Sequence, residues 1–358
     1  MQAILAVTVP FFALILAGYL AAQRGWLPLA AIPGLNGFVL FFALPCMLLR
    51  FGMNTPLAQL LDPVISSLYL VCAVLVVTLV LSLGHLLGTP RRDAAFAALV
   101  AAFPNSGFIG VPLLVALMGP GAAGPVICTM LLDMMLTTSA CLAWAQGGRA
   151  RASDGANGAW PSSVWAGSAF LAALKAPLMN PLPWSIALGG ALSALDLTLW
   201  GPVEKTVWML ADAASPVALF TIGAVLWRSR VGQVAPAQPL PQQDSPSGLP
   251  DRWADEPPPS PAQTPLLLSV VTIKLVLHPV LVWSGCLAAR TLGAPLTDLQ
   301  VTAITLMSAL PSASNVSMLA ERYGADNGLV ARIIMGSTTA AFITFSLWAW
   351  AFGVQPAP

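Results

Sequence analysis

The stretch that decides the fold is "AAFPNSGFIGVPLL", residues 101–114. It places Pro104, Gly107 and Pro112 in the middle of an apolar run that is long enough to cross a bilayer. Proline and glycine interrupt helices and free backbone polar groups, and such groups are costly when they face lipid. A helix broken at this depth is therefore expected inside a bundle, against protein or a water-filled cavity.

The composition of the whole chain defines a membrane protein. Of its 358 residues, 57% are hydrophobic and 8% charged, and the mean hydropathy is +0.81. A water-soluble domain of this size could not cover itself with so few charges. The net charge of +1 argues against a nucleic-acid groove. Because the five cysteines lie singly in apolar runs, neither a disulfide framework nor a metal site is expected: Cys46, Cys72, Cys128, Cys141 and Cys286.

Apolar segments of about 20 residues, the length needed for one helical crossing, recur along the chain. The fold expected is an all-α integral membrane protein with ten transmembrane helices, at residues 2–21, 35–53, 65–88, 95–118, 124–146, 183–200, 205–227, 266–289, 299–320 and 328–353.

The basic residues of the connections give an orientation, since Lys and Arg are retained on the cytoplasmic side. Odd-numbered connections hold eleven of them and even-numbered ones three, which predicts that both termini lie outside. The eleven are Arg24, Arg91, Arg92, Arg149, Arg151, Lys175, Arg228, Arg230, Arg252, Arg322 and Arg332, and the three are Arg50, Lys205 and Arg290.

Two connections are long. Residues 147–180 contain "WPSSVWAGSAFLAALK", which favours a helix along the membrane interface, with a plain linker as the alternative. Residues 228–264 contain "EPPPSP" and little apolar surface, so we expect a disordered cytoplasmic loop.

The two halves of the chain resemble each other in order. Pro45 precedes Gly52 by seven residues in the second segment, and Pro216 precedes Gly223 by seven in the seventh. The fourth and ninth segments both contain a proline break, and the fifth and tenth share "LTTSA" and "GSTTA". Each unit has five spans, so the second must enter the membrane upside down. The predicted domains are residues 1–146, the connection 147–180, and residues 181–358.

An inverted repeat brings the two broken helices, 4 and 9, together inside the bundle. If they cross at Pro104 and Pro311, the half-helices that start near Ser106 and Ser314 direct their electropositive ends at one point, which favours an anion. The alternative is that both prolines only kink their helices and that no substrate site lies between them. The substrate-binding candidates are the polar and small residues around the breaks: Asn105, Ser106, Gly107, Ser312, Ser314 and Asn315.

Three ionisable residues lie inside apolar segments. A charge costs roughly 2.5–3.5 kcal/mol at the centre of a span, so Lys274 and Asp133 should face the bundle interior. Lys274 is a candidate for substrate binding, and Asp133 and His278 are candidates for ion or proton coupling. The alternatives are a structural ion pair of Asp133 with Lys274, and a packing role for His278.

These sequence features do not indicate an enzyme. There is no nucleotide-binding loop, convincing nucleophile with its base, or cofactor fingerprint, so no cofactor and no catalytic residue is expected. The energy source would then be an ion gradient, the membrane potential or the gradient of the substrate itself.

Several ordered motifs resemble the auxin efflux carrier family, including its bacterial malonate-transporter-like members. They are "FPNSGFIGVPLL", "NPLPWSIALGGALSAL", "SPVALFTIGAVL", "KLVLHP", "LPSASNVSMLAERYG" and "STTAAFITF". The resemblance implies ten spans, inverted five-span repeats, crossing helices 4 and 9, and substrate-binding asparagines at Asn105 and Asn315. The Pro-rich insertion departs from the mid-chain loop of the plant members, so regulation through that loop is not implied.

The function expected is secondary transport of small organic anions, malonate-like carboxylates or auxin-like acids, across the bacterial inner membrane by alternating access. The alternatives are a sodium- or proton-coupled exchanger of inorganic ions and a membrane sensor of organic acids. The expected partners are the anion, membrane lipid and a coupling proton or sodium ion, with no nucleic acid. Whether the protein forms a homodimer is left open by the sequence.

Overall fold

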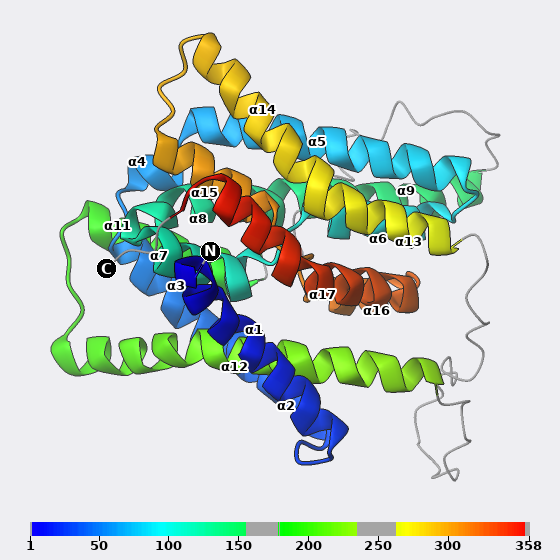
Figure 1. Ribbon diagram of the computed structural model, residues 1–358, viewed down its shortest axis with the longest axis horizontal. Helices are drawn as coiled ribbons and strands as arrows, with labels where there is room; N and C mark the ends of the chain where they lie inside the picture. Colours follow the sequence, from blue (N-terminus) through cyan, green and yellow to red (C-terminus); the bar gives the residue numbers. More distant parts are fainter. Residues whose placement is uncertain (1, 155–177, 179, 235–262, 355–358) are drawn as a thin grey trace.

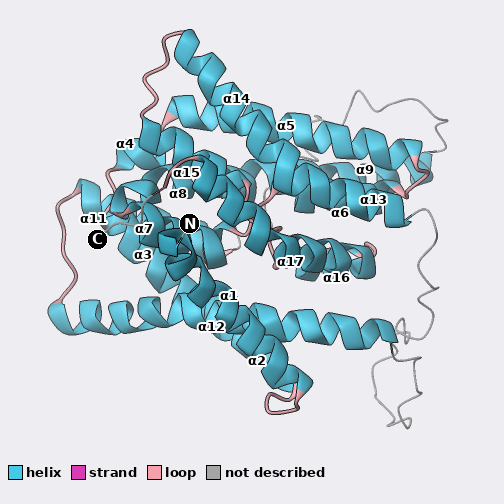
Figure 2. Cartoon of the chain, in the orientation of Figure 1, coloured by secondary structure: helices cyan, strands magenta, loops and turns pink. Residues whose placement is uncertain are grey.

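A computed structural model describes residues 2–154, 178, 180–234 and 263–354 of the chain. In this part of the chain the regular elements are helices joined by loops, and no strand is present (Figure 2). Seven of the helical segments are long and apolar enough to cross a membrane. The prediction of an all-helical integral membrane protein is therefore confirmed.

The first half of the chain contains the helices up to residue 154. They are α1 (Gln2–Gln23), α2 (Ile32–Phe38), α3 (Leu44–Met53), α4 (Leu57–Leu60), α5 (Pro63–Leu86), α6 (Arg91–Ala102), α7 (Val111–Met118), α8 (Ala123–Leu132) and α9 (Thr138–Asp154). Short 3-10 or π-helical segments lie between some of them: η1 (Leu29–Ala31), η2 (Val39–Ala43), η3 (Ser106–Gly110), η4 (Pro120–Ala122) and η5 (Asp133–Thr137).

The second half repeats this style of construction. Its helices are α11 (Pro181–Ala194), α12 (Gly201–Val234), α13 (Gln263–Thr272), α14 (His278–Thr291), α15 (Asp298–Ser308), α16 (Val316–Tyr323) and α17 (Asn327–Ala351). A π-helical segment, η6 (Ile273–Leu277), joins α13 to α14.

Three of the ten expected segments are not single long helices. Residues 95–118 and 299–320 are both interrupted, as the proline breaks predict. The segment expected at 183–200 is wrong at its end, because α11 stops at Ala194. Asp196 there adopts a left-handed backbone (φ 51°), which an α-helix cannot continue through. α11 has 14 residues and is therefore roughly 21 Å long, shorter than the hydrocarbon layer.

Two expected connections begin later than predicted. α9 continues to Asp154 and α12 to Val234, beyond the expected ends at residues 146 and 227. The expected interfacial helix at 160–175 and most of the Pro-rich segment 228–264 lie outside the described residues.

Prolines explain three of the four π-helical segments. η2, η3 and η6 each end two residues before a proline, namely Pro45, Pro112 and Pro279. Since proline donates no backbone hydrogen bond, the helix needs one locally wider turn there. Four residues before Pro279, the carbonyl oxygen of Leu275 accepts a hydrogen bond from the indole Nε1 of Trp348 at 3.1 Å.

The interrupted helices lie between two groups of uninterrupted ones. Figure 1 shows α1, α2, α3 and α12 on one side of them, and α5 with α14 on the other. α6 packs against α5, and α15 against α14, while α7 contacts α1 and η3 contacts α12. The breaks are therefore enclosed by protein, which meets the requirement for irregular backbone at membrane depth.

Glycines allow the closest helix contacts of the first group. A Cβ added to Gly18 of α1 would overlap the carbonyl oxygen of Phe220, and one added to Gly223 of α12 would overlap that of Ile15. The same holds for α3 and α11, where Gly52 faces Gly189. Without a hydrophobic driving force inside lipid, such close backbone packing is a main source of helix association.

Candidate functional site

The two interrupted helices meet at their breaks. The backbone N–H of Asn105 donates to the carbonyl oxygen of Pro311 at 2.8 Å, and the N–H of Ala313 donates to the carbonyl oxygen of Phe103 at 3.0 Å. These two bonds form an isolated antiparallel bridge. Each break thereby forms hydrogen bonds with backbone groups that the other break leaves free. A backbone polar group without a hydrogen bond is costly at this depth.

Side chains cap the helix ends that face this crossing. The hydroxyl of Ser312 donates to the carbonyl oxygen of Val100 near the end of α6, at 2.7 Å. The ammonium of Lys274 donates to the carbonyl oxygen of Ser308, the last residue of α15, at 3.2 Å. The last carbonyls of a helix have no partner within it and carry partial negative charge, so both contacts are favourable.

A narrow hollow lies beside the crossing. It encloses about 320 Å³ of non-atom space, part of which opens to the surroundings. Its lining is mostly apolar with a few polar groups, as is usual for a small-molecule site. The lining residues are Leu40, Leu44, Phe103, Pro104, Asn105, Ser106, Gly107, Phe108, Met130, Met134, Leu182, Ala313 and Asn315.

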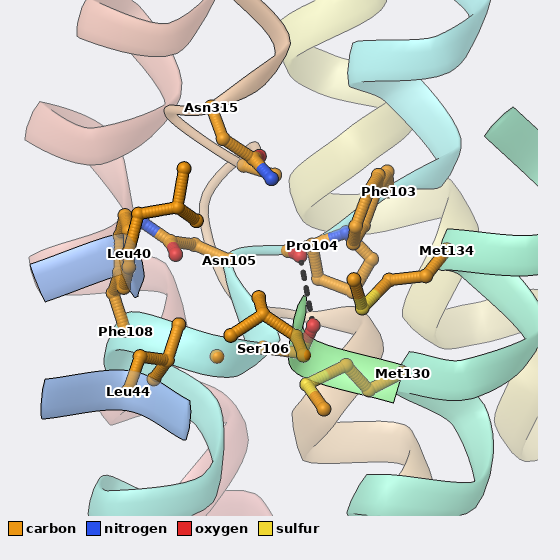
Figure 3. A pocket seen from close by; sticks show the side chains of 13 residues that line it. Leu40, Leu44, Phe103, Pro104, Asn105, Ser106, Phe108, Met130, Met134 and Asn315 are labelled. Atoms are coloured by element: carbon orange, nitrogen blue, oxygen red, sulfur yellow. Dashed lines mark hydrogen bonds between the residues drawn. The ribbon is translucent and has the colours of Figure 1, made fainter. Parts of the chain in front are cut away.

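Asn105 and Asn315 bring their amides to this hollow from opposite helices. Figure 3 shows Asn315 reaching across the space above Pro104, with Asn105 beside Leu40. Asn105 is 4% exposed, and neither side-chain amide makes a hydrogen bond in the described part of the chain. Asn315 is half-buried. An amide can both donate and accept, so these two groups are suited to a ligand that makes hydrogen bonds of either kind.

The other candidates around the breaks take different places. Ser106 and Gly107 line the hollow, and the hydroxyl of Ser106 donates weakly to the carbonyl oxygen of Pro104 at 3.4 Å. Ser314 lines a second hollow, next to the first. Ser312 is fully buried and lines neither, because its hydroxyl and N–H are used between the helices.

Asp133 is fully buried behind the hollow rather than in it. One carboxylate oxygen accepts from the hydroxyl of Tyr69 at 2.8 Å, and the other accepts from Thr137 at 3.0 Å. Thr138 donates to the carbonyl oxygen of Asp133 at 2.8 Å, at the π-helical segment that carries this residue. The neighbouring Met134 lines the hollow, whereas Asp133 does not.

Lys274 and His278 are also fully buried and line neither hollow. The ammonium of Lys274 lies 3.3 Å from Nδ1 of His278, while Nε2 of His278 makes no hydrogen bond. The rings of His278 and Tyr69 lie 5.8 Å apart, so the groups around Asp133 and Lys274 are neighbours. In the described part of the chain no direct ion pair joins Asp133 to Lys274.

Sequence reasoning missed three members of this buried cluster, namely Tyr69, Thr137 and Ser308. Tyr69 could have been found, since a tyrosine in the apolar run "SSLYLVC" needs a partner for its hydroxyl. Ser308 could not, because it contributes only its backbone carbonyl. Among the described residues no group of three or more His, Cys, Asp and Glu side chains is placed to hold a metal ion.

Apolar helices of spanning length, with two interrupted members that meet at a polar crossing, define a polytopic α-helical membrane protein. Residues 3–349 match the family described as "Membrane transport protein", and the chain belongs to that family. The resemblance to the auxin efflux carrier family is thereby confirmed. A relative from Rhizobium meliloti (strain 1021), described as "Putative malonate transporter", is 26% identical over 370 residues, which cover 100% of this chain and 99% of the relative.

Proposed function

We propose that this membrane transport protein is a secondary active transporter that moves small organic anions, malonate-like carboxylates or auxin-like acids, by alternating access. The observation that carries the proposal is the pair of unbonded amides, Asn105 and Asn315, beside two half-helix starts. Helix N-termini carry partial positive charge, and neutral amides can donate to a carboxylate without fixing it permanently.

The interior of the bundle supports an anion rather than a cation in the hollow. No carboxylate lines it within the described residues, and Asp133 is held behind it by Tyr69 and Thr137. The name of the Rhizobium meliloti relative agrees with a dicarboxylate as substrate.

An inverted repeat of two five-helix units is part of the proposal. The contact of Gly18 with α12 and that of Gly189 with α3 support it. If the first helix (α1) corresponds to the sixth (α11), and the second (which contains α3) to the seventh (α12), then the contact of α1 with α12 corresponds to the contact of α11 with α3. The glycines Gly52 and Gly223, which the sequence comparison aligns, then occupy equivalent places in these contacts.

The orientation in the bacterial inner membrane, with both termini outside, follows from the basic residues of the connections. Coupling to a proton or sodium ion would use the buried groups Asp133 and His278, which do not line the hollow.

Transport by purified protein in liposomes tests the function. Labelled malonate or an indole acid should enter, driven by its own gradient or by an imposed proton or sodium gradient. Asn315→Ala should reduce this flux, while Asn54→Ala, an exposed amide bonded to Arg50, serves as the matched control. Organic-acid binding without flux would replace the proposal by a sensor, and cation flux indifferent to organic acids would replace it by an exchanger.

A further inference from the structure

A second hollow continues from the first. It encloses about 450 Å³ of non-atom space and shares Leu40, Phe108 and Asn315 with the first hollow. Asn315 therefore stands between the two. A ligand group held by Asn315 is therefore adjacent to the residues that line the second hollow.

The second hollow contains one cationic side chain among its described lining residues. Arg228, near the end of α12, lines it together with the neutral groups Asn36, Ser314 and Ser317. The guanidinium is exposed, and it makes no hydrogen bond, ion pair or ring contact with the described part of the chain. This differs from Arg24 and Arg50, which lie over Trp26 and Trp208.

The remaining lining groups do not neutralise this charge. No Asp or Glu is among the described residues of the hollow. The hydroxyl of Ser317 is used within its own helix start, where it donates to the carbonyl oxygen of Ser314 at 3.1 Å. An anion entering here would therefore meet the guanidinium without competition from a protein carboxylate.

We propose that Arg228 binds the second carboxylate of a dicarboxylate whose first carboxylate lies at Asn105 and Asn315. The inference rests on the proposed function and deepens it, since it makes Arg228 the residue that selects dicarboxylates over monocarboxylates. A guanidinium suits this role because its planar fork pairs with both oxygens of a carboxylate. The first carboxylate meets only neutral amides and helix ends, so the charge-specific contact falls on the second.

Binding of two ligands of equal size tests the inference. Malonate and its monoamide, malonamate, differ by one charge, and their affinities for the full-length protein in detergent can be measured by calorimetry. The wild-type protein should prefer malonate about tenfold or more, the effect of one charge-assisted pair. Arg228→Gln should remove this preference by weakening malonate binding while malonamate binding stays within about twofold. Arg228→Lys should retain part of it, since the charge remains but the fork is lost.

Arg24→Gln is the matched control, because it removes an arginine that lies over Trp26 and should leave both affinities unchanged. A wild-type protein that binds both ligands equally overturns the inference and leaves the proposed function intact, and this measurement needs no variant. A preference that survives in folded Arg228→Gln also overturns it. If the wild-type protein binds neither ligand nor any other organic acid, the proposed function fails and the inference with it.

Discussion

The backbone N–H of Asn105 donates a hydrogen bond of 2.8 Å to the carbonyl oxygen of Pro311, a residue of the other interrupted helix. The same asparagine presents its unbonded side-chain amide to the hollow. Its backbone therefore holds the crossing together while its side chain stays available for a ligand. This separation predicts that the site can be altered without unfolding the crossing.

Asn105→Ala and Asn315→Ala should each weaken organic-anion binding about tenfold, the loss expected for one hydrogen bond to a charged group. The melting temperature in detergent should change little, because neither amide has a partner in the described protein. Calorimetry with malonate and thermal unfolding of the same samples check both statements. Unchanged affinity in both variants would remove these side chains from the site.

Tyr69→Phe should lower the free energy of unfolding by about 1–3 kcal/mol, because it leaves one oxygen of the buried Asp133 without its donor at 2.8 Å. Thermal or denaturant unfolding in detergent measures it. Tyr323→Phe is the control, since this ring packs on Phe96 and its hydroxyl makes no hydrogen bond in the described part of the chain. In a double-mutant cycle with Asp133→Asn, additive effects would contradict a coupled pair.

Gly18→Ala and Gly223→Ala should each destabilise the protein by about 1–3 kcal/mol, since the added methyl group forces α1 and α12 apart. The loss should be visible as a lower melting temperature and a smaller monodisperse yield. Gly37→Ala, where an added Cβ meets nothing within 4 Å, should not destabilise. Equal behaviour of all three variants would mean that these helices do not pack through their glycines.

Asp93→Asn should make the protein less sensitive to pH. Burial raises the pKa of this carboxyl above its usual value, although the N–H of Asp326, which donates to it at 2.8 Å, opposes the shift. The folded state thus favours the protonated form, so stability is lost as the pH rises from about 4 through the raised pKa. The asparagine keeps an acceptor oxygen and cannot ionise.

The melting temperature of Asp93→Asn minus that of the wild type should therefore become larger as the pH rises from 4 to 7. Asp93→Ala also removes the acceptor for Asp326 and should be less stable than Asp93→Asn throughout this range. A constant difference between wild type and Asp93→Asn across the range would show that burial of this carboxyl does not affect stability.

Much of the fold could be read from local patterns. Seven spanning helices and two interrupted ones follow from apolar length and from Pro104 and Pro311, because the bilayer requires about 20 apolar residues per crossing and tolerates breaks only inside a bundle. The end of α11 at Ala194 could not be read, since leucines still alternate with Asp196 and Thr198 up to Trp200, and the left-handed backbone at Asp196 is visible only in the structure.

The sequence by itself determined that the chain crosses a membrane, where its helices break, and which polar residues stand beside the breaks. These properties depend on the hydropathy and backbone chemistry of neighbouring residues. Only the tertiary structure decided that Asn105 and Asn315 make no side-chain hydrogen bond in the described part of the chain, that Lys274 caps α15, and that Arg228 lines the second hollow together with Asn315. These are contacts between residues far apart in the chain, and their partners are chosen by packing, which no local pattern encodes.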